Sequence, residues 1–143
     1  MLTSGSNSAP QHLFVYGTLV DPLKLDEVIG HRHMGERLRA RLHGFERIAP
    51  GDYPYPYLVP SPDAAVEGIL VMDLSATDFD ALDVYEEVAL GLYERLRVEV
   101  EAWGCGPHSA YLQAHTYVGG ARLTALPRNA RSAMAQPTGS TAR

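Results

Sequence analysis

Two segments of this chain alternate between apolar and charged residues, and this feature constrains the fold more than any other in the sequence. Their apolar positions are Leu38, Ala40 and Leu42 in the first segment, and Leu96, Val98, Val100 and Ala102 in the second. Every residue between them is Arg or Glu. A period of two places one side of a strand against a core and the other toward solvent. Both segments are therefore predicted to be half-buried β-strands.

Other local patterns complete the predicted sheet. Residues 11–16 form a strand candidate that is apolar on both faces, 65–73 form another, and a Gly/Pro turn joins 96–102 to 110–118 as an antiparallel hairpin. The stretch 50–62 contains five prolines, which remove backbone donors, so it predicts a loop or edge segment but not a central strand.

Two short helices are expected between the strands. The dipeptide Asp21-Pro22 has the cap-then-proline order of a helix start and predicts a helix over 22–29. Ser75 and Asp78 have the spacing of a capping box, which predicts a helix through Glu87. The fold class is therefore predicted as α+β, with a small, mostly antiparallel and barrel-like sheet flanked by short helices.

Composition limits the domain organisation and the partners. The 143 residues predict one domain over 11–118, a flexible leader over 1–10 and an Arg-containing, disordered tail over 119–143. Residues 1–118 hold eight basic and seventeen acidic residues, a net charge of −9 that disfavours nucleic-acid binding. The single cysteine favours a reducing cytoplasm, and neither a secretory signal nor a membrane span is recognisable. The oligomeric state is left open.

Glu86 is the most informative candidate for chemistry. At about 100° per residue it projects between Phe79 and Leu82, on the apolar side of the second predicted helix, whereas Asp83 points elsewhere. Burial favours the protonated form of a carboxylate, so Glu86 is a candidate general acid/base that takes and returns a proton near neutral pH. The alternative is a structural glutamate that caps a backbone or pairs with an arginine such as Arg95.

The turn Tyr16-Gly17-Thr18-Leu19 is the second candidate. A buried strand ends there in a glycine-permitted turn before a helix, so successive backbone N–H groups can converge on a small carboxylate. The alternative is a turn that only ends a strand.

The remaining reactive side chains carry weaker signals. His31-Arg32-His33 lacks partner ligands at a telling spacing and predicts a surface loop instead of a metal site. Cys105 falls in a predicted hairpin tip and receives no role. Ser109 and His115 have no third group that would complete a hydrolase triad.

Five short motifs give the chain a family resemblance. In order they are Tyr16-Gly17-Thr18-Leu19, Tyr55-Pro56-Tyr57-Leu58-Val59-Pro60, Val66-Glu67-Gly68, Leu82-Asp83-Val84-Tyr85-Glu86 and Tyr93-Glu94-Arg95. In this order and spacing they resemble the motif series of the γ-glutamylcyclotransferase-like family. The resemblance runs from about Leu13 to Val118.

The resemblance implies a fold, a reaction and a set of site residues. It implies a small mixed barrel in which the backbone of Tyr16, Gly17, Thr18 and Leu19 binds substrate and Glu86 is the acid/base. Family enzymes release 5-oxoproline when the α-amine of a γ-glutamyl group attacks its own γ-carbonyl. No metal, nucleotide or other cofactor is implied, and the expected partner is a small γ-glutamyl molecule. Tyr93 and Tyr117 fall where the family often has tyrosines and are expected to line the pocket.

Two alternatives to a cyclotransferase stay open on the sequence. One is a non-catalytic member of the same fold that binds a small acidic metabolite or a protein. The other is a deacylase that removes a γ-glutamyl protecting group with the same residues. The second differs only in the leaving amine, which depends on pocket shape.

Overall fold

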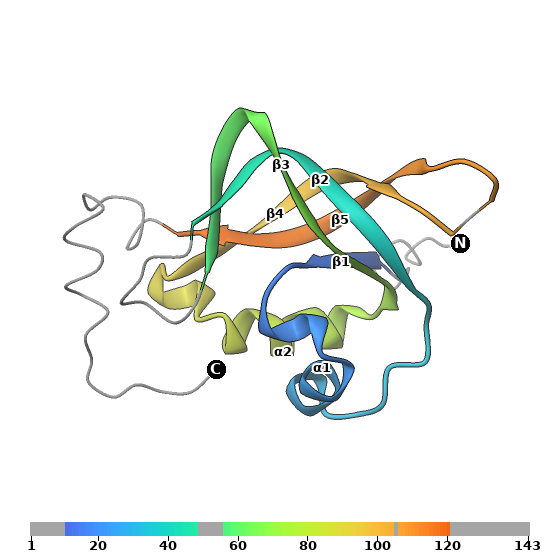
Figure 1. Cartoon of the computed structure of the whole chain (residues 1–143). Coiled ribbons are helices and arrows are strands. Elements are labelled where there is room, and N and C mark those ends of the chain that lie inside the picture. Colours follow the sequence, from blue (N-terminus) through green and yellow to red (C-terminus); the bar gives the residue numbers. More distant parts are fainter. Residues whose placement is uncertain (1–10, 49–55, 105, 121–143) are drawn as a thin grey trace, which may run out of the picture.

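Five strands close into a barrel, and two helices lie together on one side of it (Figure 1). The computed structural model describes residues 11–48, 56–104 and 106–120. The strands are β1 (Gln11–Val15), β2 (Arg37–Ile48), β3 (Tyr57–Leu74), β4 (Tyr93–Ala102) and β5 (Ala110–Gly119). The helices are α1 (Pro22–Ile29) and α2 (Ala76–Tyr85), with short 3-10 turns η2 (Thr18–Val20) and η3 (Val88–Leu90).

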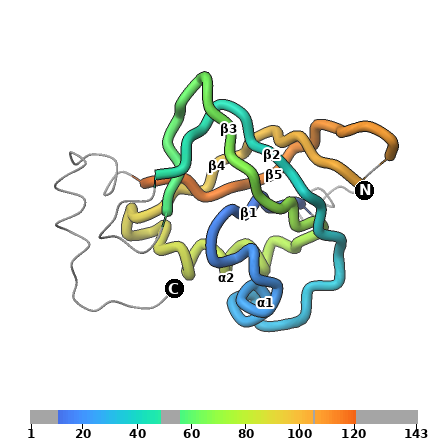
Figure 2. The backbone as a smooth tube through the Cα atoms, in the orientation of Figure 1, coloured from blue at the N-terminus to red at the C-terminus, as the bar shows by residue number. Residues whose placement is uncertain are grey.

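The barrel has the strand order β1-β3-β2-β4-β5. All neighbouring pairs are antiparallel except β1 and β5, which pair in parallel through Leu13 and His115 and close the barrel. β2 and β3 run side by side along most of their length (Figure 2). The predicted α+β class, with a mostly antiparallel barrel, two short helices and a hairpin of β4 and β5, is confirmed.

Both helices begin where their capping residues predict. The Asp21 carboxylate accepts the Leu23 N–H at 3.0 Å, and Gly30 ends α1 in the left-handed conformation. At α2, the Ser75 hydroxyl accepts the Asp78 N–H at 3.1 Å and Asp78 accepts the Ser75 N–H at 3.0 Å, so the capping box is complete. The expected end of α2 is wrong by two residues, because the helix stops at Tyr85.

The strand predicted over 65–73 is longer than expected, because it begins inside the proline-rich stretch 50–62. β3 begins at Tyr57, continues through Pro60 and ends at Leu74 as one strand. Its first residues pair with β2, from Tyr57 with Ile48 to Pro60 with Phe45, whereas its recorded pairs with β1 begin only at Ile69. The prolines thus occupy an end of β3 that has one partner strand, where a missing N–H is tolerated.

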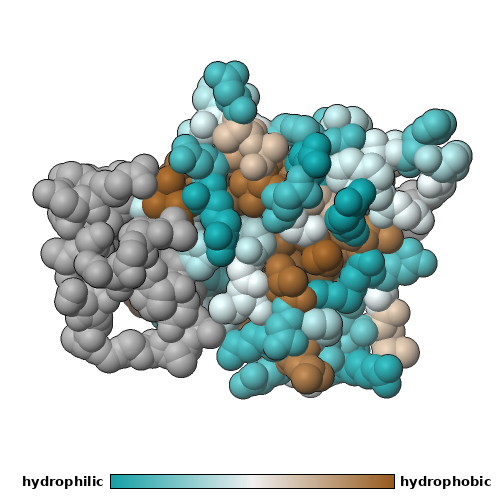
Figure 3. Space-filling view, viewed as in Figure 1, coloured by the Kyte–Doolittle hydropathy of each residue, from teal (hydrophilic) through white to brown (hydrophobic). Residues whose placement is uncertain are grey.

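The apolar residues form two packed clusters. The helix-side core joins the helices to the barrel and consists of Leu13, Val15, Leu19, Leu25, Ile29, Ile48, Tyr57, Val71, Leu74, Phe79, Leu82, Tyr93 and Tyr117. The barrel core consists only of strand residues: Phe14, Leu38, Ala40, Leu42, Leu58, Val66, Leu70, Val100, Ala102, Ala114 and Val118. On the face in Figure 3, hydrophilic residues cover much of the outer surface of the strands, as the charged alternate positions predict.

Some predictions fall beyond this description. The leader over 1–10, most of the tail over 119–143, the start of the proline-rich stretch and Cys105 lie outside the described residues. Within the described ranges, no helix has the length and apolar character that crossing a membrane requires.

Candidate active site

A pocket opens where the end of β1 meets the ends of α2, β4 and β5. It is lined by Phe14, Val15, Tyr16, Gly17, Thr18, Leu19, Pro56, Glu86, Tyr93 and Tyr117. All seven candidate site residues from the sequence are in this set. The pocket is open to solvent, and the empty space within it and at its mouth is about 420 Å³. The structure therefore brings the candidates together, although they are spread over more than 100 residues.

Glu86 reaches the pocket from the end of α2, not from within the helix. It is the C-terminal capping residue, its N–H donates to the Leu82 carbonyl at 2.9 Å, and its side chain is half-buried. Glu87 follows with φ +56, a left-handed conformation that is uncommon for a side-chain-bearing residue. This turn ends the helix and directs the chain into η3. Glu86 is thus fixed at a rigid corner beside the pocket.

The turn after β1 is braced from two sides. Gly17 precedes η2 and accepts the Val20 N–H at 3.0 Å through its carbonyl. Arg37, at the start of β2, donates to the Val20 carbonyl at 2.5 Å, and the hydroxyls of Thr18 and Tyr85 lie 3.3 Å apart. No sequence signal predicts this role for Arg37, because its place beside the alternating segment predicts only a solvent-facing charge. These contacts hold the turn against both the barrel and α2.

Two tyrosines close the pocket by donating to backbone carbonyls. The Tyr16 hydroxyl donates to the Tyr117 carbonyl at 2.6 Å, which ties the end of β1 to β5. The Tyr93 hydroxyl donates to the Pro56 carbonyl at 2.9 Å, which ties β4 to the residue before β3. Tyr93 is buried. These bonds satisfy polar atoms that would be costly to bury alone.

Tyr117 has a different partner. Its hydroxyl donates to Asp83 Oδ1 at 2.6 Å, and Arg95 Nε lies 3.1 Å from the same oxygen. Burial, followed by the hydrogen bond to Asp83, raises the pKa of Tyr117 well above its ordinary value, and the negative charge of Glu86 adds to this. The phenol is therefore protonated across the physiological range. Asp83, which the helix periodicity places off the apolar side of α2, thus contacts a residue that lines the pocket.

The contacts of Asp83 come from two barrel strands beside α2. Its helical position relative to Phe79 and Leu82 places it off the apolar side of α2, but β4 and β5 bring Arg95 and Tyr117 to that flank. No local pattern predicts this approach.

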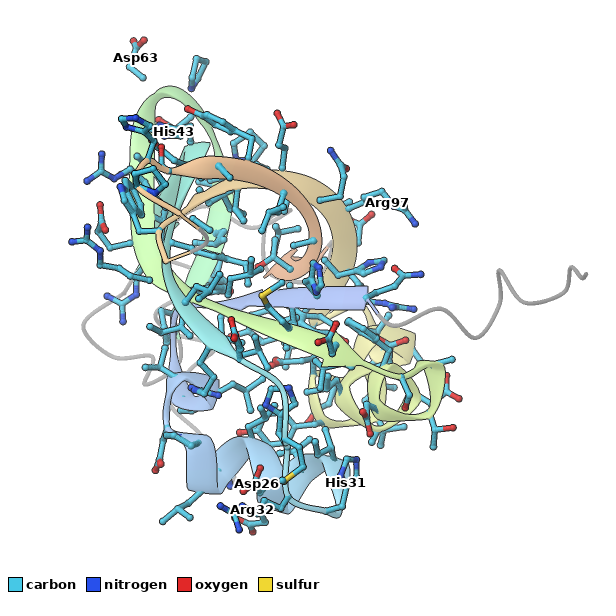
Figure 4. The ribbon with its side chains drawn as sticks, turned by 90° about the vertical axis from the view of Figure 1, so that its right-hand side faces the viewer. Asp26, His31, Arg32, His43, Asp63 and Arg97 are labelled. Atoms are coloured by element: carbon cyan, nitrogen blue, oxygen red, sulfur yellow. The ribbon has the colours of Figure 1, made fainter. Side chains whose placement is uncertain are left out.

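The weaker candidates lie away from the pocket. His31 bonds Asp78 Oδ1 at 2.7 Å and His33 bonds the Met72 carbonyl at 2.6 Å, so both imidazoles attach the loop after α1 to its neighbours. Figure 4 places His31 beside α1, and His43 at the end of the barrel far from the helices. Among the described residues, no group of three His, Cys, Asp or Glu side chains is arranged to hold a metal ion.

Ser109 and His115 do not meet. The Ser109 hydroxyl donates to Glu101 at 2.8 Å, whereas His115 bonds the Gln11 side chain and packs on the Phe79 ring at 4.8 Å. Burial, reinforced by the charges of Arg95 and Arg97, lowers the pKa of His115 below its ordinary value. The two side chains therefore form no catalytic pair.

Known proteins are similar to this chain in sequence and in fold. A family model described as gamma-glutamyl cyclotransferase, AIG2-like, matches residues 13–135. The chain is 30% identical over 115 residues to Protein AIG2 C of Arabidopsis thaliana, a match covering 79% of this chain and 65% of that relative. The chain belongs to the gamma-glutamyl cyclotransferase, AIG2-like family, and the predicted resemblance is confirmed.

Solved structures give the same result for the fold. The solution structure of an Arabidopsis thaliana protein matches with a TM-score of 0.65 and 28% identity, covering 76% of this chain and 61% of that one. A solved gamma-glutamyl cyclotransferase matches with a TM-score of 0.61 and 16% identity, covering 95% of this chain and 92% of that one. This chain thus spans less than two thirds of the length of Protein AIG2 C, and less than two thirds of the Arabidopsis thaliana chain in the solution structure.

Proposed function

We propose that this protein is a γ-glutamylcyclotransferase that releases 5-oxoproline and a free amine from a small γ-glutamyl substrate. The observation that carries the proposal is the convergence of Glu86 with the Tyr16–Leu19 turn in one pocket. Family membership and the fold of a solved gamma-glutamyl cyclotransferase support it. In this assignment Glu86 is the acid/base, and the backbone of the turn holds the substrate α-carboxylate.

The reaction needs one proton carrier and a fixed geometry. The substrate α-ammonium loses a proton to Glu86, and the amine nitrogen then forms a bond to the γ-carbonyl carbon. The leaving nitrogen takes that proton back from Glu86 as its bond to the carbon breaks, and Glu86 then takes the second proton of the new ring nitrogen and passes it to the released amine. The turn contributes by holding the α-carboxylate so that the amine reaches its own carbonyl. The substrate supplies the nucleophile, so this chemistry calls for no metal or cofactor.

The pocket also fits the second candidate from the sequence, a non-catalytic member that binds a small acidic metabolite. The observation that favours catalysis is the position of the carboxylate. In a site that only bound an anionic ligand, the charge of the half-buried Glu86 would repel the ligand and weaken binding. In a catalytic site the same carboxylate has a use, because it takes and returns a proton.

A panel assay tests the proposal. We would incubate the protein with γ-glutamyl amines, γ-glutamyl dipeptides and glutathione, and follow 5-oxoproline by mass spectrometry beside Glu86→Gln. The proposal expects release by the wild type from at least one substrate, none by the variant, and a leaving group named by the substrate consumed. If a wild type that is as folded as the variant releases nothing from any compound, the binding alternative takes its place, and thermal shift with the same panel identifies its ligand.

A further inference from the structure

We propose that Asp83, held by Arg95, is a positioning residue that accepts the hydrogen bond of the Tyr117 hydroxyl, so that the Tyr117 oxygen in turn accepts a hydrogen bond from the substrate α-amine. This inference rests on the proposed function, because it assigns a task within that reaction. It adds two residues to the seven that the sequence singled out.

The direction of the Tyr117 hydroxyl carries the argument. A phenol has one proton to donate and lone pairs with which to accept. The Tyr117 proton is committed to Asp83 Oδ1 at 2.6 Å, while Tyr117 itself lines the pocket and is 3% exposed. What the oxygen can still offer is therefore its accepting side.

Arg95 keeps Asp83 available as an acceptor. Its Nε lies 3.1 Å from Oδ1, and its guanidinium packs 4.9 Å from the centre of the Phe79 ring. Phe79 is buried, so this stacking limits the guanidinium to one place. The positive charge of Arg95 offsets that of a second carboxylate near Glu86, whose charge also acts on Tyr117.

An accepting oxygen suits the attack on the γ-carbonyl. The α-amine must keep its lone pair toward the carbonyl carbon while one N–H passes its proton to Glu86. An acceptor at Tyr117 can hold a second N–H and fix the rotation of the amine. A hydroxyl that donated into the pocket would instead bind the amine lone pair and block the attack. The hydrogen bond to Asp83 thus determines that the Tyr117 hydroxyl accepts from the amine and does not donate into the pocket.

A double-mutant cycle tests the inference. The variants are Asp83→Ala, Tyr117→Phe and the combination, with Asp80→Asn as the matched control, since Asp80 is an exposed acid one turn of α2 away. Each single variant is expected to lower kcat about 10- to 100-fold, the usual worth of a hydrogen bond to a charged group. The double variant is expected to lose no more than either single one, because both act through one hydroxyl. The control is expected to keep the wild-type kcat.

A conservative variant separates positioning from folding. Asp83→Asn keeps an accepting oxygen and is expected to recover part of the kcat that Asp83→Ala loses, at the same substrate KM. Urea unfolding of each variant checks that the variant is folded under the assay conditions, so that a lower kcat does not reflect a smaller folded fraction.

Three outcomes overturn the inference while 5-oxoproline release by the wild type still supports the proposed function. They are an unchanged kcat in Asp83→Ala, an unchanged kcat in Tyr117→Phe, and losses that multiply in the double variant. A wild type that turns over no member of the panel overturns the proposed function and this inference with it.

Discussion

The two apolar clusters of this protein differ in what they contain and in what surrounds them. The buried members of the barrel core are aliphatic except for Phe14, and all come from strands. The helix-side core includes Tyr57, Tyr93 and Tyr117 and lies against the pocket. The barrel core packs strands against one another inside the barrel. The helix-side core packs the barrel against the helices and includes tyrosines, whose hydroxyl groups are polar.

β1 links the two clusters and explains why they can coexist. Leu13 and Val15 belong to the helix-side core, and Phe14 between them belongs to the barrel core. A strand that is apolar on both faces is therefore what this architecture requires at its centre. The pocket begins at the last residues of that strand, where the chain leaves both clusters. The comparison predicts that stability depends mainly on the barrel core and chemistry on the polar edge of the helix-side core.

The largest expected effect is on chemistry alone. Glu86→Gln is expected to lower kcat/KM by roughly 10²- to 10⁴-fold, the usual contribution of general acid/base catalysis, with little change in the free energy of unfolding. Glu87→Gln is the matched control, because this neighbouring acid does not line the pocket, and it is expected to keep its activity. Kinetics and urea unfolding of both variants check this. Equal losses in the two variants would remove the special role of Glu86.

The next effect is on stability alone. Leu70 is fully buried in the barrel core and pairs with Phe14 and Leu38 on the two neighbouring strands. Leu70→Ala is expected to lower the free energy of unfolding by about 2–5 kcal/mol because it leaves a cavity. The folded fraction is expected to keep its kcat/KM, measured at a temperature well below the transition. A large loss of kcat/KM in fully folded protein would contradict the separation of the two clusters.

A substitution between the clusters is expected to affect both properties. A Cβ at Gly68 would lie 2.7 Å from the Phe14 ring and would collide with the Val15 carbonyl. Gly68→Ala therefore forces β3 away from β1 and is expected to cost about 1–3 kcal/mol of stability. Because Val15 also lines the pocket, kcat/KM is expected to fall as well. Thermal unfolding with the 5-oxoproline assay measures both, and a variant as stable as the wild type would show that the close approach is not needed.

The smallest expected effect is a pH dependence far from the pocket. The hydrogen bond to Asp78, followed by the bond to the Arg32 carbonyl, raises the pKa of His31 above its ordinary 6.5. A raised pKa means that the folded state binds the proton more tightly than the unfolded state does. The stabilisation is therefore fully present below pH 6.5 and is lost as the pH rises through the folded-state pKa.

His31→Gln tests this sign. The variant is expected to be slightly less stable than the wild type below pH 6.5, and the difference is expected to shrink at higher pH. Urea unfolding across this range measures it. A difference that grew with pH would contradict the assignment, and activity at any pH is expected to stay at the wild-type level.

The sequence predicted what depends on neighbouring residues. The Asp21 and Ser75 caps and the alternating strands are local, and the structure has them where expected. Prediction from the sequence failed where residues on a distant strand determine the local structure. The proline-containing start of β3 is accommodated because its recorded pairs are with β2 alone, and Asp83 is bonded by Arg95 on β4 and Tyr117 on β5. The candidate site residues could be named because family motifs mark them, but their hydrogen-bond partners could not.

One measurement tests the central claim most directly. The wild-type protein is given its fastest γ-glutamyl substrate in water enriched in heavy oxygen, and the products are weighed by mass spectrometry. Intramolecular attack by the α-amine predicts 5-oxoproline without solvent oxygen. Glutamate that carries solvent oxygen would mean that water, not the substrate amine, attacks the carbonyl, and would contradict the account.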